Sequence, residues 1–467
     1  MFEKLQQFGG KAAFITERDG VVSYAEFINL ADRIGINVDA RTLVFCLCSN
    51  ELEAVAGYVG FLRNKVVSLM LPTSINLNSL NLLEARYMPT FIWAPLLDQD
   101  RLGKREIVFQ EGGYALFSAG LNRAPSLHPD LALLMSTSGS TGSPQMVRLS
   151  FSNLVSNADS IIEGLGLTAQ DIPITTLPMN YVYGLSIINS HLRIGGTIIL
   201  NSRSLMDRGF WDLLKSKKAT TFGGVPYTYE MIKRLGFDFL RSSSIEQLTQ
   251  AGGRLEPSLV RDLGLLCKEV NKRFTVMYGQ TEATSRMSIL PSQFAHIKSE
   301  SIGRAIPGGR LAIDYGDLGY EVAPGKIGEL VYFGANVSLG YATSMQDLSR
   351  GDENQGILRT GDLAWIDHEG FYYIAGRKKR FLKIFGNRIS LDDVEAFVSS
   401  EGWECACIGR DNDLQVYVTS PDNHKQLRLK VATFLGINHL AISISFVKKI
   451  PRAENGKVSY FELDEGN

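Results

Sequence analysis

Short apolar segments recur along this chain, and each precedes a turn rich in Gly, Ser or Asn and then a stretch with helical periodicity. The segments are 42-TLVFCLC-48, 66-VVSLML-71, 131-LALLMST-137, 197-TIIL-200 and 274-FTVMY-278. Buried strands that alternate with amphipathic helices are typical of layered α/β architectures. The pattern therefore predicts an α/β fold.

The length predicts more than one domain, because a single hydrophobic core rarely serves more than about 250–300 residues and this chain has 467. From about residue 300 the segment 309-GRLAIDYGDLGYEVAPGKIGELVYFGANVSLGYA-342 is dense in Gly and short alternating strands, as in a small barrel or meander. Strand and helix patterns return after the basic cluster 376-GRKKR-380. We therefore expect an N-terminal domain of residues 1–377 and a C-terminal domain of residues 378–467.

The charge balance argues against a nucleic-acid partner, since 48 Lys and Arg residues nearly match 49 Asp and Glu residues. No apolar window approaches the length of a membrane span or a secretory leader, so we expect a cytoplasmic protein without a membrane span.

Cysteine usage favours reduced thiols, because five cysteines are an odd number in a long chain. The pairs Cys46/Cys48 and Cys405/Cys407 are compatible with metal binding or with small apolar residues in buried strands. No cluster of His or Cys accompanies them, so we favour the second interpretation and expect no dedicated metal cage.

The loop 136-STSGSTGSPQ-145 directly follows an apolar segment. Backbone N–H groups and hydroxyls in such a turn can converge on an anion, which makes phosphate a natural ligand. The loop is not a Walker A motif, because no lysine follows Gly142. From its residues alone, a phosphate cradle and a flexible linker both remain open.

Further motifs decide between these alternatives. They are 23-SYAEFINLADRIG-35, 278-YGQTEAT-284, 328-GELVYFGANVSLGY-341, 358-LRTGDLAW-365, 376-GRKKRFLKIFGNRISLDDVE-395 and 451-PRAENGKVSY-460. In this order they resemble the signatures of the adenylate-forming ligase superfamily, which includes acyl- and aryl-CoA synthetases, peptide-synthetase adenylation domains and luciferases. The resemblance implies a large N-terminal domain of layered αβαβα subdomains with a β-barrel, and a small mobile C-terminal α/β domain.

The resemblance also implies a nucleotide site for ATP with Mg²⁺. Glu282 would carry Mg²⁺, Thr281 would contact the α-phosphate, and Tyr278 would stack on adenine. Asp362 and Arg377 would hold the ribose. The backbone of Gly252 and Gly253 would line the adenine, and the β- and γ-phosphates would be held by Ser138, Gly139, Ser140, Thr141 and Gly142.

Lys457 would supply the cation for catalysis, reaching the α-phosphate and the attacking carboxylate. The C-terminal domain of the family rotates between two half-reactions, and Lys379 stands at the hinge position. After the rotation, Lys383 and Gly386 would serve the thiolation step. A solvated basic patch is the alternative for the Lys-Lys-Arg cluster.

The sequence departs from the family pattern at several positions. Gln145 stands where the phosphate loop usually has Lys, which removes one cation and predicts a weaker hold on ATP. Tyr181 replaces a common His, and Gly184 stands where amino-acid-activating relatives have Asp, so we expect an acid without an α-amine. The expected acyl-pocket positions are Tyr181, Tyr183, Gly184, Tyr227 and Gly279.

Three functions remain open at this stage. The first is an ATP-dependent acid:thiol ligase that forms an acyl-AMP, releases pyrophosphate, and passes the acyl group to CoA or to the phosphopantetheine of a carrier protein. The second is an amino-acid-activating or amide-forming enzyme. The third is a catalytically silent nucleotide-binding protein, which Gln145 favours.

Overall fold

The computed structural model describes residues 1–103, 105–120, 125–136, 145–316, 319–320, 324–378, 380–384, 387–410, 412–452 and 458–464. These residues form two compact units, one from the described parts of 1–137, 143–311 and 332–358, the other from those of 312–331 and 359–467. The domain boundary between residues 377 and 378 stays a prediction. No helix in the described ranges has the length and apolar character needed to cross a bilayer.

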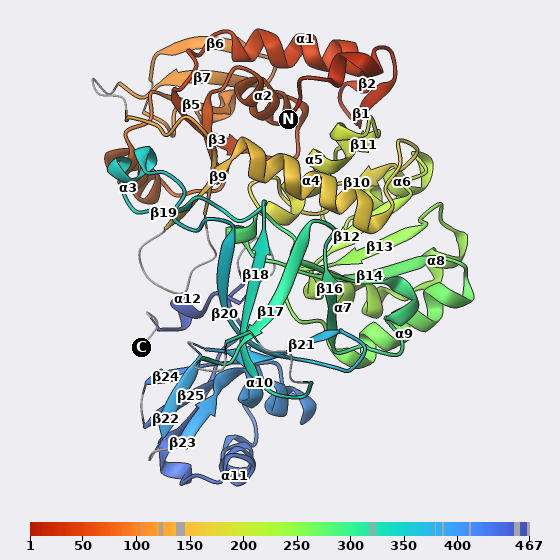
Figure 1. Ribbon diagram of the computed structural model, residues 1–467, viewed down its shortest axis with the longest axis vertical. Coiled ribbons are helices and arrows are strands. Elements are labelled where there is room, and N and C mark those ends of the chain that lie inside the picture. Colours follow the sequence, from red (N-terminus) through yellow and green to blue (C-terminus); the bar gives the residue numbers. More distant parts are fainter. Residues whose placement is uncertain are drawn as a thin grey trace. The chain divides into compact units, whose positions relative to one another are not determined.

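One sheet of the first unit contains three of the predicted strands, here β3 (Leu43–Cys48), β4 (Val67–Pro72) and β8 (Leu131–Ser136) (Figure 1). They are parallel neighbours and almost wholly buried, as expected of continuous apolar runs. The sheet also contains β5 (Phe91–Pro95), β6 (Ile107–Glu111), β7 (Tyr114–Ser118), β9 (Met146–Ser150) and β19 (Gly340–Ala342). Cys46 and Cys48 are buried in β3, which confirms their interpretation as small apolar residues.

Three helices accompany this sheet: α1 (Tyr24–Gly35), α2 (Leu52–Arg63) and α3 (Leu77–Tyr87). The first begins at the predicted motif. Ser23 is its N-cap: the Ser23 hydroxyl accepts from the N–H of Glu26 at 3.2 Å, and the Glu26 carboxylate accepts from the N–H of Ser23 at 2.8 Å. This capping box fixes where the helix starts.

The second sheet of this unit is mainly parallel. Its strands are β1 (Ala12–Thr16), β2 (Gly20–Ser23), β10 (Pro173–Ile174), β11 (Ile198–Ile199), β12 (Thr221–Gly224), β13 (Gln247–Gln250), β14 (Arg273–Tyr278), β15 (Ser288–Leu290) and β16 (Ser301–Ala305). From β1 through β11, β10, β12 and β13 to β14 the pairing is parallel, whereas β2, β15 and β16 pair antiparallel. The accompanying helices are α5 (Val182–Arg193), α6 (Arg208–Ser216), α7 (Pro226–Leu235), α8 (Asp238–Ser242) and α9 (Pro257–Glu269).

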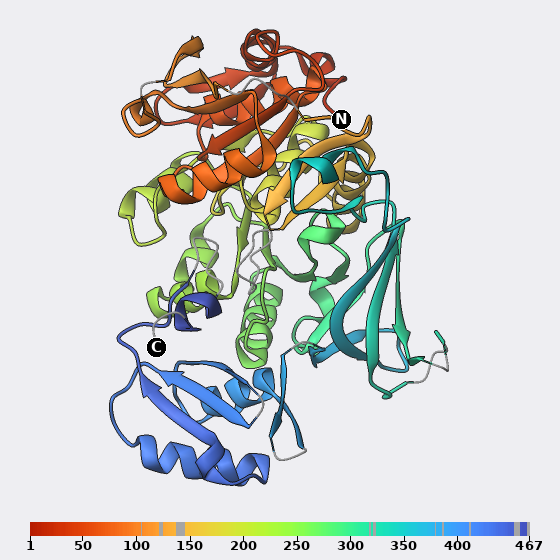
Figure 2. The same cartoon turned by 90° about the vertical axis from the view of Figure 1, so that its left-hand side faces the viewer.

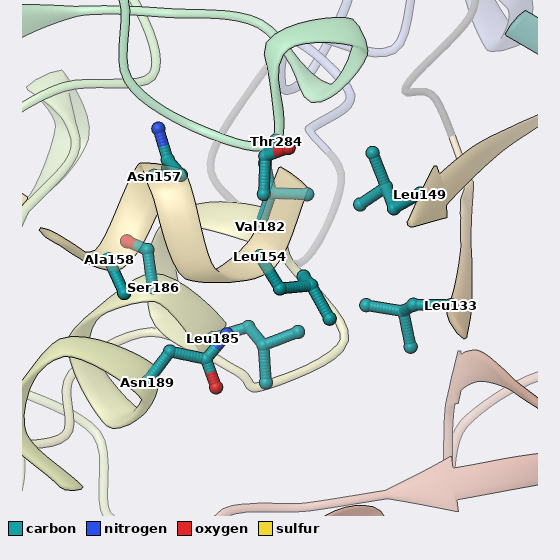
Figure 3. Close-up of a pocket in the computed structure, with 10 residues that line it drawn as sticks. All are labelled: Leu133, Leu149, Leu154, Asn157, Ala158, Val182, Leu185, Ser186, Asn189 and Thr284. Carbon is teal, nitrogen blue, oxygen red and sulfur yellow. The ribbon is translucent and has the colours of Figure 1, made fainter. Parts of the chain in front are cut away.

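Two helices, α4 (Phe151–Leu165) and α5, form a layer between the two sheets. Figure 3 shows Leu154 of α4 beside Leu133 and Leu149 of β8 and β9, around a small cavity. Ile187 of α5 lines a second cavity together with Phe222 of β12 in the other sheet. The helices therefore pack against both sheets, which gives the predicted layered arrangement.

The second unit contains parts of β17 (Gly309–Asp314), β18 (Gly328–Gly334) and β20 (Ile357–Ile366), with all of β21 (Tyr372–Arg377). Its C-terminal part is visible in Figure 2 as strands with helices beside them. The elements are β22 (Phe381–Ile384), β23 (Asn387–Ser390), α10 (Leu391–Ser400), β24 (Cys405–Arg410), β25 (Asp413–Val418), α11 (His424–Leu435), β26 (Ile442–Phe446) and α12 (Tyr460–Asp464). Apolar residues of α10, α11 and the sheet β24-β25-β26 share one core.

A fully buried guanidinium joins β9 to the segment around β19. Arg148 donates hydrogen bonds to the carbonyl oxygens of Leu339 at 2.8 Å, Tyr341 at 3.1 Å and Arg350, and pairs with the carboxylate of Glu353 at 2.6 Å. Its charge and its donors are thus matched by neighbouring acceptors, and the segment that carries Tyr341 is held in place.

We predict that Arg148→Met lowers the free energy of unfolding by at least about 2 kcal/mol, because each buried acceptor that loses its donor costs about 1–3 kcal/mol. Urea unfolding followed by tryptophan fluorescence measures this. The control is Arg208→Met, whose side chain is 93% exposed and whose replacement should stay within about 0.5 kcal/mol. Equal losses in the two variants would contradict the role of Arg148.

Candidate functional site

Four predicted site segments begin where parallel strands of the second sheet end. Segment 177–184 follows β10, 225–227 follows β12, 251–253 follows β13, and 279–282 follows β14. The strands are aligned, since Gly224 pairs with Gln250 and Gln250 pairs with Val276. The carboxyl edge of an open α/β sheet is the usual place for a ligand.

The turn that carries Glu282 is anchored by a distant asparagine. After β14 the chain makes a 3-10 turn over Thr281–Ala283. The buried Asn336 amide donates to the carbonyl oxygens of Ala283 at 2.8 Å and Arg286 at 3.0 Å. The hydroxyl of Thr284 donates back to the carbonyl oxygen of Asn336 at 2.7 Å. The position of this turn therefore depends on Asn336, which lies in the motif 328–341.

Glu282 presents its carboxylate from this turn and is half-buried. The Tyr341 hydroxyl donates to Oε1 of Glu282 at 2.7 Å. Burial, followed by the Glu282 charge, raises the pKa of Tyr341, so this hydroxyl stays protonated and remains a donor. A hydrogen-bonded carboxylate on an open turn is a hard oxygen ligand of the type that Mg²⁺ prefers.

Three predicted glycines adjoin this turn or its neighbours. At Gly279 an added Cβ would lie 1.7 Å from the carbonyl oxygen of Ser285, and at Gly252, where φ is +87°, it would lie 2.4 Å from the Tyr181 hydroxyl. Only glycine fits such close approaches. Gly253 is exposed, and Tyr278, at the end of β14, is half-buried with its hydroxyl 3.3 Å from Nε2 of Gln280.

Three of the predicted acyl-pocket residues, Tyr181, Tyr183 and Gly184, lie at the start of α5. Tyr183 is buried and its hydroxyl donates to the carbonyl oxygen of Thr249 at 2.8 Å. The ring of Tyr181 lies 6.4 Å from that of Tyr183, and burial raises the pKa of Tyr181 to about 12. A Cβ on Gly184 would lie 2.3 Å from the carbonyl oxygen of Pro178, while Tyr227, in α7, is 43% exposed.

Sequence reasoning missed one buried residue in this group. Arg286 is 2% exposed, and its guanidinium carbon lies 3.9 Å from the centre of the Tyr183 ring. Burial lowers the pKa of Arg286. The signal in the sequence is slight: Arg286 is the sole charged residue in the otherwise uncharged run 283-ATSRMSIL-290.

In the second unit, the two predicted ribose contacts meet each other. Asp362 in β20 pairs in register with Arg377 in β21, and Nε of Arg377 donates to the carboxylate of Asp362 at 3.0 Å. Asp362 is 3% exposed, whereas Arg377 is exposed. The N–H of Asp362 donates to the Thr360 hydroxyl at 3.1 Å, so the T-G-D motif holds its own backbone, while Arg377 contacts the carboxylate.

Several predicted residues lie outside the described part of the chain. They are Ser138, Gly139, Ser140, Thr141, Gly142, Lys379, Gly386 and Lys457. Lys383 lies in β22, but its side chain is not described. Gln145, which follows the loop, is exposed next to the first residue of β9.

Known proteins with similar folds support the predicted architecture. O-succinylbenzoate coenzyme A synthetase from Bacillus subtilis, in complex with AMP, superposes with a TM-score of 0.80 at 21% identity, covering 98% of this chain and 96% of that one. ATP-bound MatB from Rhodopseudomonas palustris gives a TM-score of 0.79 at 21% identity, covering 99% and 98%. At this identity the likeness concerns the fold, and it confirms the predicted α/β fold.

Curated relatives match over part of their length. An indoleacetate–CoA ligase from Aromatoleum aromaticum is 32% identical over 62% of this chain, and the match spans 56% of that enzyme. A 2-succinylbenzoate–CoA ligase from Bacillus licheniformis is 26% identical over 72% of this chain and 71% of its own.

The family match is broader. Residues 1–342 match the family described as AMP-binding enzyme, which confirms the resemblance to adenylate-forming ligases. Because this match takes in well over half of the 467 residues, the chain belongs to the AMP-binding enzyme family.

Proposed function

We propose that the protein is an AMP-forming acid:thiol ligase. In the first half-reaction a carboxylate oxygen attacks the α-phosphorus of ATP, forming the acyl-AMP and releasing pyrophosphate. In the second half-reaction a thiol attacks the acyl carbon, giving a thioester and AMP. The observation that carries this proposal is that the predicted nucleotide segments 251–253 and 278–282 leave adjacent strands at one sheet edge in a chain of the AMP-binding family.

Different residues would bind different parts of ATP. Tyr278, with the backbone of Gly252 and Gly253, would hold adenine, and Thr281 would contact the α-phosphate. Asp362 is kept oriented by Arg377, which suits a carboxylate that accepts from two ribose hydroxyls. The loop with Ser138, Gly139, Ser140, Thr141 and Gly142 would hold the β- and γ-phosphates, and Lys457 would approach the reacting carboxylate.

The donor set at Glu282 fits a magnesium ion, since it offers a carboxylate oxygen on an open turn. Mg²⁺ would neutralise charge on the phosphate oxygens of ATP. A related O-succinylbenzoate coenzyme A synthetase from Bacillus subtilis has been solved with ATP and a magnesium ion. In this chain, Tyr341 orients the Glu282 carboxylate, and Asn336 holds the turn beneath it.

The proposed acid lacks an α-amine. An Asp at position 184 has no room, because even a Cβ there would lie 2.3 Å from the carbonyl oxygen of Pro178. A substrate ammonium would therefore lack the carboxylate that amino-acid-activating relatives supply, and it would also meet the charge of Arg286. The names of the relatives support CoA as the acceptor, although they include acids as different as indoleacetate and oxalate. A carrier-protein thiol is the alternative acceptor, and the second-step residues proposed are Lys383 and Gly386 with Lys379 as the hinge.

We predict acid-dependent exchange of pyrophosphate into ATP. Glu282→Gln should lower the exchange rate about 100-fold or more, because an electrostatic contact made to the transition state is worth about that much, and Lys457→Ala should abolish exchange. The measurement is isotope exchange across a panel of fatty, hydroxy, aryl and amino acids.

The matched control for this prediction is Glu163→Gln, the same change on the exposed surface of α4, which should leave the rate unchanged. If the parent binds ATP but exchanges with no acid, the protein is the catalytically silent nucleotide binder that Gln145 favours. Exchange restricted to amino acids would instead indicate the amino-acid-activating enzyme.

Gln145 offers a gain-of-function test. We predict that Gln145→Lys tightens ATP binding about 5-fold, because a charge-assisted hydrogen bond is roughly twice as strong as a neutral one. Isothermal titration with ATP and Mg²⁺ measures the dissociation constant. Gln110→Lys, at an exposed position of β6, adds the same charge elsewhere. An equal gain in ATP affinity in both variants would assign the effect to net charge. No gain in affinity in Gln145→Lys would contradict the prediction.

A further inference from the structure

A small cavity lies between the helices α4 and α5 and the strands β10, β12 and β13, and its lining residue Thr249 contacts the predicted pocket residue Tyr183. Most of its lining is apolar, with side chains such as Ile174, Ile187 and Phe222. The charged residue in this lining is Arg286, which sequence reasoning did not assign. Since the proposed substrate is a carboxylic acid, the nature of the cavity bears on which acid fits.

The guanidinium of Arg286 has no acidic side chain beside it in the described part of the chain. Its Nε contacts the Met277 sulfur at 3.2 Å and one terminal nitrogen donates to the Ser285 hydroxyl, while the ring of Tyr183 covers one face. Among the residues that the structure describes, its contacts and charge partners include no carboxylate. A thioether is a weak acceptor, and a buried charge without a counter-ion is costly. The guanidinium N–H groups that are not used by Met277 and Ser285 can donate to a bound anion.

Two polar atoms of the cavity wall lack hydrogen-bond partners among the described residues. They are Oγ1 of Thr221 and Nε2 of His191, in side chains that are 6% and 3% exposed. Nδ1 of His191 lies 2.8 Å from the carbonyl oxygen of Ile187 and therefore carries the proton of the neutral ring. Nε2 is then a hydrogen-bond acceptor, and burial lowers the pKa of His191, which favours this neutral form. Buried polar atoms without partners are rare and call for an explanation.

The cavity is linked to the proposed reaction centre through one turn. Arg286 follows Glu282 by four residues, and its Cα lies 2.9 Å from where a Cβ of Gly279 would be. Tyr183, which covers the guanidinium, is a predicted pocket residue whose hydroxyl also lies 2.8 Å from the Thr249 hydroxyl. Thr249 and Arg286 both line the cavity. An acid whose reacting end lies near Thr281 and Glu282 therefore has Arg286 deeper in the same pocket wall.

We propose that Arg286 binds a second carboxylate at the far end of the substrate, so that the acid is a dicarboxylate. The guanidinium supplies paired N–H donors to this carboxylate, and Thr221 adds a hydroxyl donor. The substrate thus provides the counter-ion that the described residues do not supply. This inference rests on the proposed function of the same site, because the cavity is assigned as part of its acid pocket.

The test compares dicarboxylates with monocarboxylates of equal carbon number: succinate with butyrate, glutarate with pentanoate, adipate with hexanoate, and phthalate with toluate. Acid-dependent pyrophosphate exchange gives kcat/KM for each. We expect the parent to prefer at least one dicarboxylate about 100-fold over its partner, as for a buried charge pair. Arg286→Met should erase this preference while retaining the monocarboxylate, and Arg286→Lys should keep part of it. Arg208→Met, on the exposed surface, should leave the preference intact.

Thermal unfolding separates this inference from the proposed function. Without acid, Arg286→Met should not lower the melting temperature, because it removes an uncompensated charge. Adding a preferred dicarboxylate should raise the melting temperature of the parent protein but not that of Arg286→Met. If no acid supports exchange, the ligase proposal fails. The binding role of Arg286 is then judged by the melting temperatures: stabilisation of the parent protein by a dicarboxylate supports it, and the lack of such stabilisation overturns it.

Three results would overturn the inference. One is a parent that uses monocarboxylates as well as their dicarboxylate partners. Another is an unchanged preference in Arg286→Met. The third concerns two variants together. We expect Thr221→Val to weaken the preference for dicarboxylates; if Thr221→Val leaves that preference unchanged and Arg286→Met does not fold, Arg286 is a structural cation that packs on Tyr183.

Discussion

The site of this protein depends on the register of three parallel strands. Gly224, Gln250 and Val276 are aligned across β12, β13 and β14, so β12 and β13 end at one level and β14 continues past it to Tyr278. The segments with Tyr227, Gly252 and Tyr278 lie at this edge of the sheet. Because side chains alternate between faces along a strand, a slip of one residue would turn each of these strand ends to the other face. Helices α4 and α5, packed between the two sheets, oppose such a slip by filling the space on one side.

Two buried arginines show how the surroundings of a charge distinguish structure from binding. Arg148 is enclosed by carbonyl oxygens and by Glu353, so its charge is balanced within the protein. Arg286 is similarly buried but contacts a thioether, a hydroxyl and an aromatic ring. Cation–π contact contributes about 1–2 kcal/mol, whereas an uncompensated buried charge costs several. These surroundings fit a structural role for Arg148, and for Arg286 they fit the proposed binding of an anion.

Local sequence signals predicted much of the fold. The S-Y-x-E motif marked the start of α1 because its capping box is made by residues three positions apart. The apolar runs became β3, β4 and β8 for an equally local reason. The motif order also led to Asp362 and Arg377, and the register of β20 with β21 places them together.

Long-range contacts were beyond the reach of these signals. Asn336 holds a carbonyl oxygen at Ala283 across 53 residues of chain, and Arg286 reaches Tyr183 from a different strand end. Such pairs follow from strand order, which no local pattern encodes. The Gly279 backbone also packs directly on Ser285, so the turn from Glu282 to Arg286 has little freedom to change its width. If Glu282 serves the nucleotide and Arg286 the far carboxylate, this rigid turn sets the separation between the two ends of the substrate. Backbone packing then selects acids by their length, and the charge of Arg286 selects acids that carry a second carboxylate.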